Sequence, residues 1–268
     1  MASEEVARVR RLIDGLRRDR RIHPLHGRRE YSQRVREVAS ACGVLLETEP
    51  AAVPGLAGRA VDRITSALMF MDDSSGIVGS DLRVMMAVHA RACAAAPPDP
   101  KRLAAWLARL RLDGPGWPDF ELRDYAAALG ETGAAELARI VDQRARDAEP
   151  DLLGRTPFAI RILREQLAEL SGDVDAYVRV VAGDLYGAPQ YLKIVNALRK
   201  AGRTTDAEQW AHRGLTQTGN PIDIGKLRDC YVDLLFERGA TDEALALRQA
   251  LFDTHPTQGV GKVAVSGR

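Results

Sequence analysis

The sequence has few of the residues on which catalytic and ligand-binding motifs depend. Its 268 residues include only three cysteines and five histidines, and aromatic residues make up 5% of the chain. Cys42, Cys93 and Cys230 are widely separated, so the spacing offers neither a disulfide framework nor a metal-binding pair. The nucleophile elbow, the phosphate-binding loop, the HExxH motif and the dinucleotide fingerprint are also missing. We therefore expect no enzyme activity, no cofactor and no metal site.

Long apolar runs are missing as well. No stretch reaches the roughly 18 apolar residues of a membrane helix, and the N-terminus is charged where a signal peptide is apolar. The net charge is only +1, so global electrostatics predicts no acidic partner. Together with the unpaired cysteines, these absences predict a soluble, cytoplasmic protein that does not enter a membrane.

The residues that are abundant favour helices. Alanine, leucine, arginine and glutamate dominate the composition, and all four are strong helix formers. Apolar residues recur at helical spacing along the chain, and Val6, Val9, Ile13 and Leu16 form the first such stripe. We therefore predict an all-α protein.

Residues 191–252 contain one helix-turn-helix pattern written twice, at an offset of 37 positions. The matched pairs are Val195 and Val232, Leu198 and Leu235, Gly202 and Gly239, Ala207 and Ala244, and Trp210 and Leu247. A period of this length is typical of tetratricopeptide-type hairpins, which bury their apolar faces by stacking on neighbours. The pattern predicts a right-handed stack of antiparallel helical hairpins, a tetratricopeptide-like α-solenoid, with Trp210 buried between helices.

The repeat is regular only near the C-terminus. Gly172, at the preceding turn, lies 30 rather than 37 residues before Gly202, and Pro150 and Gly154 interrupt the helical pattern. We predict an N-terminal helical bundle with irregular hairpins over residues 1–148, tetratricopeptide-like repeats over 156–256 and a disordered tail over 257–268. One continuous solenoid is the alternative.

Two short patterns have a possible chemical interpretation, and in both the structural interpretation is favoured. The acidic turn at 72–76 lacks the alternating ligands and closing glutamate of a calcium loop, so it is expected to separate two helices, with Ser80 or Asp81 capping the second. His89 and Cys93 lie one helical turn apart, but two ligands do not make a metal site. We expect both side chains in the core or at its boundary.

Residues 71–79, 112–115, 171–176 and 191–203, with the segment from Arg20 to Tyr31, resemble the C-terminal helical region of bacterial SWIM zinc-finger proteins. That region is an uncharacterised domain that also occurs without the finger, and the resemblance extends over residues 8–256. The finger needs a CxC pair and a later CxH, which this chain lacks, so zinc and DNA binding are not implied. The resemblance implies tetratricopeptide-like stacking and association with other macromolecules.

The predicted function is a non-enzymatic scaffold for protein–protein interaction, with an unknown partner bound along the first helices of the stacked hairpins. Residues outside the apolar stripes recur there at the repeat offset. The candidate partner face consists of Tyr191, Lys193, Asn196, Arg228 and Asp233. The alternative interpretation of the same residues is ordinary solvated helix surface.

The last hairpin lacks an evident polar cap, because residues 258–268 are rich in glycine, valine and serine without helical periodicity. Leu245, Leu251 and Phe252 are therefore expected to form an exposed apolar end. We expect the chain to self-associate through this end or to be unstable there.

The first 36 residues contain eleven arginines and five acidic residues, which gives this segment a net charge of +6. The alternative function is therefore a nucleic-acid-associated accessory module. Its candidate phosphate contacts are Arg17, Arg18, Arg20, Arg21, Arg28 and Arg29. Aromatic side chains for base stacking are absent from this segment apart from Tyr31, so a solvated arginine-rich surface is the other interpretation.

Overall fold

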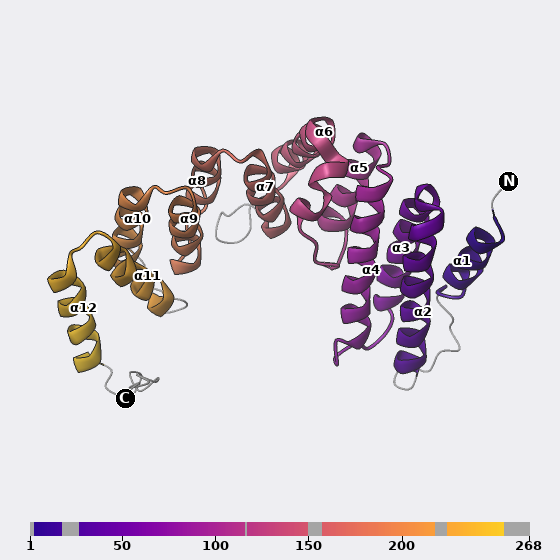
Figure 1. Cartoon of the computed structure of the whole chain (residues 1–268), viewed down its shortest axis with the longest axis horizontal. Helices are drawn as coiled ribbons and strands as arrows, with labels where there is room; N and C mark the ends of the chain where they lie inside the picture. The colour runs from indigo at the N-terminus through magenta and orange to yellow at the C-terminus, as the bar shows by residue number, and fades with distance from the viewer. Residues whose placement is uncertain (1–2, 18–26, 116, 150–156, 218–223, 255–268) are drawn as a thin grey trace, which may run out of the picture. The chain divides into compact units, whose positions relative to one another are not determined.

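The computed structural model describes residues 3–17, 27–115, 117–149, 157–217 and 224–254, with side chains described up to residue 249. Within these residues the structure has twelve α-helices, two short 3-10 helices and no β-strand, which confirms the predicted all-α class (Figure 1). The helices form two compact units, Met1–Ser171 and Gly172–Arg268. The predicted tail at 257–268 lies outside the described residues.

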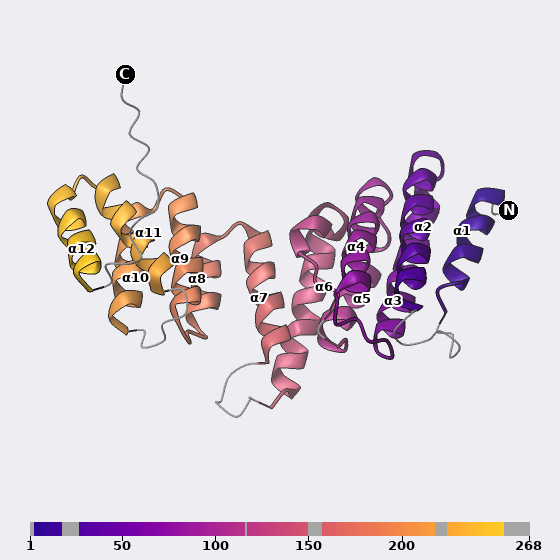
Figure 2. The ribbon, with the colours of Figure 1, turned by 90° about the horizontal axis from the view of Figure 1, so that it is seen from below.

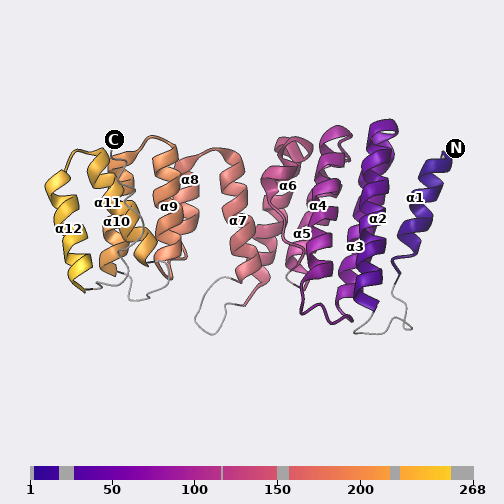
Figure 3. The same cartoon turned by 60° about the horizontal axis from the view of Figure 1, so that its bottom comes forward.

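The first unit is built from α1 to α7. Their bounds are α1 Glu4–Asp14, α2 Gly27–Thr48, α3 Val53–Leu68, α4 Ile77–Ala95, α5 Pro100–Leu112, α6 Ala126–Asp147 and α7 Phe158–Ser171, with η1 Pro50–Ala52 before α3 and η2 Leu122–Tyr125 before α6. Helices α2 and α4 lie side by side and begin at the same end of the unit, and α3 packs against both (Figure 3). Helices α5 and α6 pack against each other as a hairpin.

The core of the first unit follows the predicted apolar stripes. Val6, Val9 and Ile13 of α1 are buried, and Ser3 caps the start of the helix, because its hydroxyl accepts a hydrogen bond from the N–H of Val6. Tyr31 of α2 is 1% exposed, and its hydroxyl donates to the carbonyl of Leu16 at 3.1 Å. The helical periodicity of the sequence therefore places the correct side chains inside this unit.

The boundary between the two units lies one helix later in the chain than the predicted boundary. The sequence placed the boundary between residues 148 and 156, whereas the compact units divide after Ser171. Helix α7 belongs to the first unit because it packs against α6 and η2. Leu163 is fully buried there, and the side chain of Gln166 accepts a hydrogen bond from the N–H of Leu122 at 3.2 Å.

The second unit contains α8 Val174–Ala182, α9 Ala188–Lys200, α10 Thr204–Gln217, α11 Ile224–Glu237 and α12 Thr241–Thr254 (Figure 2). Each of these helices packs against the next, and α9 also contacts α11. The buried positions of α9 and α10 recur on α11 and α12. Val195 and Val232, Leu198 and Leu235, and Ala207 and Ala244 are all at most 1% exposed.

The two hairpins of the second unit also share their turn geometry. Gly202 and Gly239 have φ angles of 74° and 82°, in the left-handed region that glycine adopts at little cost. The N–H of Arg203 donates to the carbonyl of Leu198, and the N–H of Ala240 donates to that of Leu235, at 2.9 Å in both turns. These are the long-range hydrogen bonds of a Schellman motif. The repeat seen in the sequence is therefore present in the backbone.

A close approach of three helices surrounds Gly214 on α10. A Cβ atom at this position would lie 2.7 Å from both the Cγ of Tyr191 on α9 and the Cδ2 of Leu227 on α11. Trp210, one turn earlier, was predicted to be buried but is only half-buried. Its indole lies beside Tyr191, with ring centroids 6.0 Å apart, and Arg213 stacks over its other side. The glycine, rather than the indole, allows the helices to approach.

Candidate functional site

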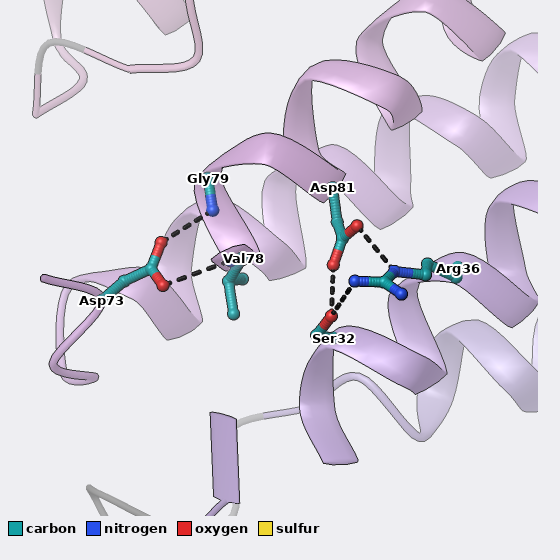
Figure 4. A network of polar contacts seen from close by, with 6 residues as sticks. All are labelled: Ser32, Arg36, Asp73, Val78, Gly79 and Asp81. Atoms are coloured by element: carbon teal, nitrogen blue, oxygen red, sulfur yellow. Dashed lines mark hydrogen bonds and ion pairs between the residues drawn. The ribbon is translucent and has the colours of Figure 1, made fainter. Parts of the chain in front are cut away.

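A polar network joins α2 to α4 at the ends where both helices begin (Figure 4). Asp81 is 7% exposed, and its two carboxylate oxygens accept from the Nε of Arg36 at 2.9 Å and from the hydroxyl of Ser32. The Nη2 of Arg36 also donates to the Ser32 hydroxyl at 3.1 Å. Because all three side chains bond to one another, the arrangement stabilises the packing of two helices and leaves no activated nucleophile.

The acidic turn before α4 caps that helix. The N–H groups of Val78 and Gly79 donate to the carboxylate of Asp73, at 3.1 Å and 2.7 Å (Figure 4). The predicted caps, Ser80 and Asp81, are wrong, because α4 begins earlier, at Ile77, and both residues lie inside it. A carboxylate at a helix N-terminus satisfies free N–H groups and complements the helix dipole. The turn therefore has a structural role.

His89 and Cys93 lie in the core of the first unit, as predicted. The Nδ1 of His89 lies 3.1 Å from the hydroxyl of Tyr125, and the Nε2 of His89 lies 3.6 Å from the Sγ of Cys93. The ring of Trp106 is 4.4 Å away between centroids. Burial lowers the pKa of His89 to about 4 and raises the pKa of Cys93 to about 12. At neutral pH both groups are uncharged, so this cluster is a packed core feature rather than a reactive pair.

The predicted partner face lies in the second unit, and the structure changes its membership. Asn196 on α9 and Asp233 on α11 are exposed, and Lys193 and Arg228 are half-buried. The prediction that Tyr191 lies outside the core is wrong: it is 5% exposed, and its hydroxyl donates to Gln217 at 3.0 Å. The space beside Gly214 accounts for the difference, because it admits the tyrosine ring between α9 and α10.

Two exposed residues that the sequence analysis missed lie beside this face, Lys200 on α9 and Asp229 on α11. We define the repeat face as Lys193, Asn196 and Lys200 of α9 with Asp229 and Asp233 of α11. Lys200 lies one turn after Asn196 and Asp229 lies one turn before Asp233, so helical spacing from the predicted residues could have found both.

The repeat face is electrostatically divided. Helix α9 contains no acidic residue, whereas α11 contributes two exposed carboxylates. Arg199 links the helices by an ion pair with Glu237, and its Nη1 lies 3.4 Å from the Sγ of Cys230. The link joins α9, whose charged residues are all basic, to α11, where Asp229, Asp233 and Glu237 outnumber Lys226 and Arg228.

The arginines near the N-terminus are not gathered into one site in the described residues. Arg17 is exposed and lies 3.6 Å from Asp14, and Arg29 is exposed. Arg28 is directed to the acidic turn, where its Nη1 donates to the carbonyl of Asp72 at 3.2 Å. The remaining predicted phosphate contacts, Arg18, Arg20 and Arg21, lie outside the described residues.

At the predicted apolar end, Leu245 of α12 is 53% exposed. Leu251 and Phe252 belong to α12, but their side chains lie outside the described residues. The equivalent of Leu245 in the preceding repeat is Glu208, which is covered by an ion pair with Arg238 at 3.2 Å. The two hairpins thus differ at this position, where one side chain is covered by the following turn and the other is open.

Residues 4–260 match a family of unknown function, DUF6880. The chain belongs to this family. No curated protein and no solved structure matches it. The family description mentions neither SWIM zinc fingers nor tetratricopeptide repeats, so that resemblance stays a prediction.

The residues that the structure describes contain no group of three or more histidine, cysteine, aspartate or glutamate side chains placed to hold a metal ion. Among the described helices, none combines the length and apolar character that a membrane span requires.

Proposed function

We propose that this protein is a non-enzymatic, cytoplasmic helical-repeat scaffold that binds a protein partner on the repeat face of α9 and α11. One observation carries the proposal: the features of the α9–α10 hairpin recur 37 residues later. These features are the glycine turn, the buried positions and one exposed position, Asn196, whose equivalent is Asp233. Stacked hairpins of this kind expose a row of first helices, which is where repeat proteins bind extended partners. The proposal includes tetratricopeptide-like stacking and kinship with the helical region of SWIM zinc-finger proteins.

The charges of the repeat face indicate which charges a complementary partner would have. A segment lying across α9 meets lysines, and on reaching α11 it meets two carboxylates. The partner proposed is therefore a peptide with an acidic part followed by a basic part, rather than a uniformly charged polymer. The three cysteines are free and buried, which suits a reducing compartment.

Site-specific photocrosslinking in cells of the native host tests this function. A photoreactive phenylalanine is placed at Asn196 or Asp233, which are equivalent exposed positions of the repeat face. The controls are Gln209 on α10 and Ala246 on α12, which are exposed and also 37 residues apart. We expect the same crosslinked protein from both face positions and its absence from both controls. Equal labelling at all four positions, or none at the face, would reject the repeat face.

We also propose that α12 mediates self-association. Leu245 occupies the position at which the preceding hairpin is covered by Arg238, and its exposed side chain favours contact with a second copy. Light scattering at increasing concentration should show a dimer in the wild type and a monomer in Leu245→Glu. A monomer in both proteins at high concentration would reject the proposal.

The alternative, a nucleic-acid-associated accessory module, draws support from the exposure of Arg17 and Arg29. Arg28 already has acidic-turn partners, which weakens the case. Binding of short duplexes that falls steeply with salt would favour this alternative, and the absence of binding at low salt would remove it.

A further inference from the structure

Helix α4 of the first unit presents an exposed side with only one sign of charge. Its exposed residues are Ser80, Arg83, Val84, Ala87, Arg91, Ala94 and Ala95. The only carboxylate on the helix, Asp81, is buried against α2, where it accepts from Ser32 and Arg36 (Figure 4). The outer side of α4 therefore has two guanidinium groups and no acidic side chain to neutralise them.

These two arginines are not held by carboxylates, whereas several other arginines of the unit are. Arg34, Arg63, Arg109, Arg111, Arg139, Arg144 and Arg164 all form ion pairs. Arg83 and Arg91 form none within the part of the chain that the structure describes, and no acidic residue lies one turn away from either on α4. The two are separated by two helical turns, about 12 Å along the axis. Their charges are available to a partner.

Helix α2 extends this surface. Arg36 lies beside the start of α4, and its side chain is 66% exposed even though it pairs with Asp81. Val84, which is 52% exposed, and Ala87 supply apolar surface between the arginines. We define the arginine face as Arg36, Arg83, Val84, Ala87 and Arg91.

The mixture of charges and apolar groups identifies the class of partner. A nucleic acid would use the guanidinium groups but would gain little from an exposed valine and alanine, and this face has no aromatic side chain on which a base could stack. An acidic protein helix can use both, with carboxylates on the arginines and an apolar side chain on Val84 and Ala87. The small Ala87 lets such a helix approach closely.

We infer that the arginine face docks an acidic, amphipathic helical segment of a partner protein. This surface lies in the first unit, so the inference does not rest on the repeat face. Glutamates two turns apart on the partner match the spacing of Arg83 and Arg91, and an apolar residue between them faces Val84. Since the groups are exposed, the association is expected to be weak and to decrease with salt.

The test uses the full chain and a defined probe. The probe is a fluorescent alanine-based helical peptide of about 16 residues, with glutamates two turns apart and leucine between them; a matched peptide has lysines instead. The variant Arg83→Glu/Arg91→Glu is compared with Arg59→Glu/Arg102→Glu, which makes the same change of charge at exposed, unpaired arginines of α3 and α5. Circular dichroism confirms that both variants fold.

At about 50 mM salt we expect saturable binding of the glutamate peptide and none of the lysine peptide. Arg83→Glu/Arg91→Glu should weaken binding about tenfold, and the α3–α5 variant less than about twofold. If both variants weaken binding equally, the net charge of the protein alone accounts for the binding, and the inference is overturned. No binding at millimolar protein would overturn it as well. Tighter, α4-dependent binding of a short DNA duplex would also overturn it in favour of a nucleic-acid site.

Discussion

The two units of this chain bury different kinds of residue. Among the residues that the structure describes, the first unit buries five polar or charged side chains, namely Ser32, Asp81, His89, Arg111 and Glu165, whereas the second buries only Gln190. The first unit thus joins helices by hydrogen bonds between particular partners. The second has a repeated apolar core with glycines at turns and close approaches, and its polar links between helices, such as Arg199 with Glu237, involve side chains that are not buried.

This difference has consequences for stability and for function. Buried polar groups are stable only while each keeps its partner, so the first unit should be sensitive to pH and to single polar substitutions. The second unit should be sensitive to side-chain volume instead. Each unit also has a proposed binding surface, the arginine face in the first and the repeat face in the second. Each surface uses side chains that remain accessible after the helices of its unit have packed.

The largest expected effect is a loss of stability of the first unit in acid. Burial lowers the pKa of His89 to about 4 in the folded protein, from its ordinary value of 6.5. Because the folded pKa is the lower one, the unfolded chain binds a proton first as pH falls. Stability is therefore lost between pH 6.5 and 4, by about 3 kcal/mol in total.

Hydrogen exchange resolved by unit measures this loss. His89→Gln, which cannot titrate, is the control. The stability of this variant should fall less than that of the wild type over the same pH range, and the difference is the contribution of His89. Exchange in the second unit is the internal reference, because no histidine is buried in the part of that unit that the structure describes. Equal pH dependence in wild type and variant would contradict the assignment.

The second largest effect concerns volume in the second unit. Gly214→Ala places a Cβ atom 2.7 Å from Tyr191 and Leu227, and the helices must separate to accept it. We expect a loss of about 2 to 3 kcal/mol in the free energy of unfolding, measured with urea. Gly225→Ala is the matched control, because its Cβ would meet nothing within 4 Å. That variant should gain about 0.5 to 1 kcal/mol from helix propensity; destabilisation by both would show that backbone conformation matters more than packing.

A third effect comes from the half-buried indole of the second unit. Trp210→Ala removes the contacts with Tyr191 and Arg213, and we expect a loss of about 2 kcal/mol, less than for a fully buried tryptophan. Urea unfolding followed by circular dichroism measures it. A loss of about 4 kcal/mol or more would show that the ring is a core residue after all.

What could be predicted from the sequence follows the same division. The repeat offset of 37 residues led to three buried pairs and to equivalent turns at Gly202 and Gly239, because periodicity and turn chemistry are local signals; Trp210 and Leu247, the fourth apolar pair, are only half-buried. The burial of Tyr191 was missed because it depends on the absence of a side chain at Gly214, on another helix. A pattern read along one helix does not contain that information.

The polar contacts of the first unit were missed for a related reason. Asp81 and Ser32 are 49 positions apart, and His89 and Tyr125 are 36 apart. Hydrogen-bonded pairs so distant leave no periodic trace in a single sequence. Spacing on one helix could predict only that His89 and Cys93 are neighbours. The arginine face depends on the burial of the Asp81 carboxylate, which the sequence does not reveal.

The smallest effect separates the two units most directly. Asp81→Asn removes the charge that accepts from Arg36 and Ser32, and we expect a loss of about 1 to 2 kcal/mol. The loss is moderate because the Arg36 side chain is largely exposed and remains hydrated. Asp233→Asn, at an exposed position of the second unit, should change the unfolding free energy by less than about 0.5 kcal/mol. If both substitutions have the same small effect in urea, specific polar contacts do not distinguish the first unit, and its stability must come from apolar packing as in the second.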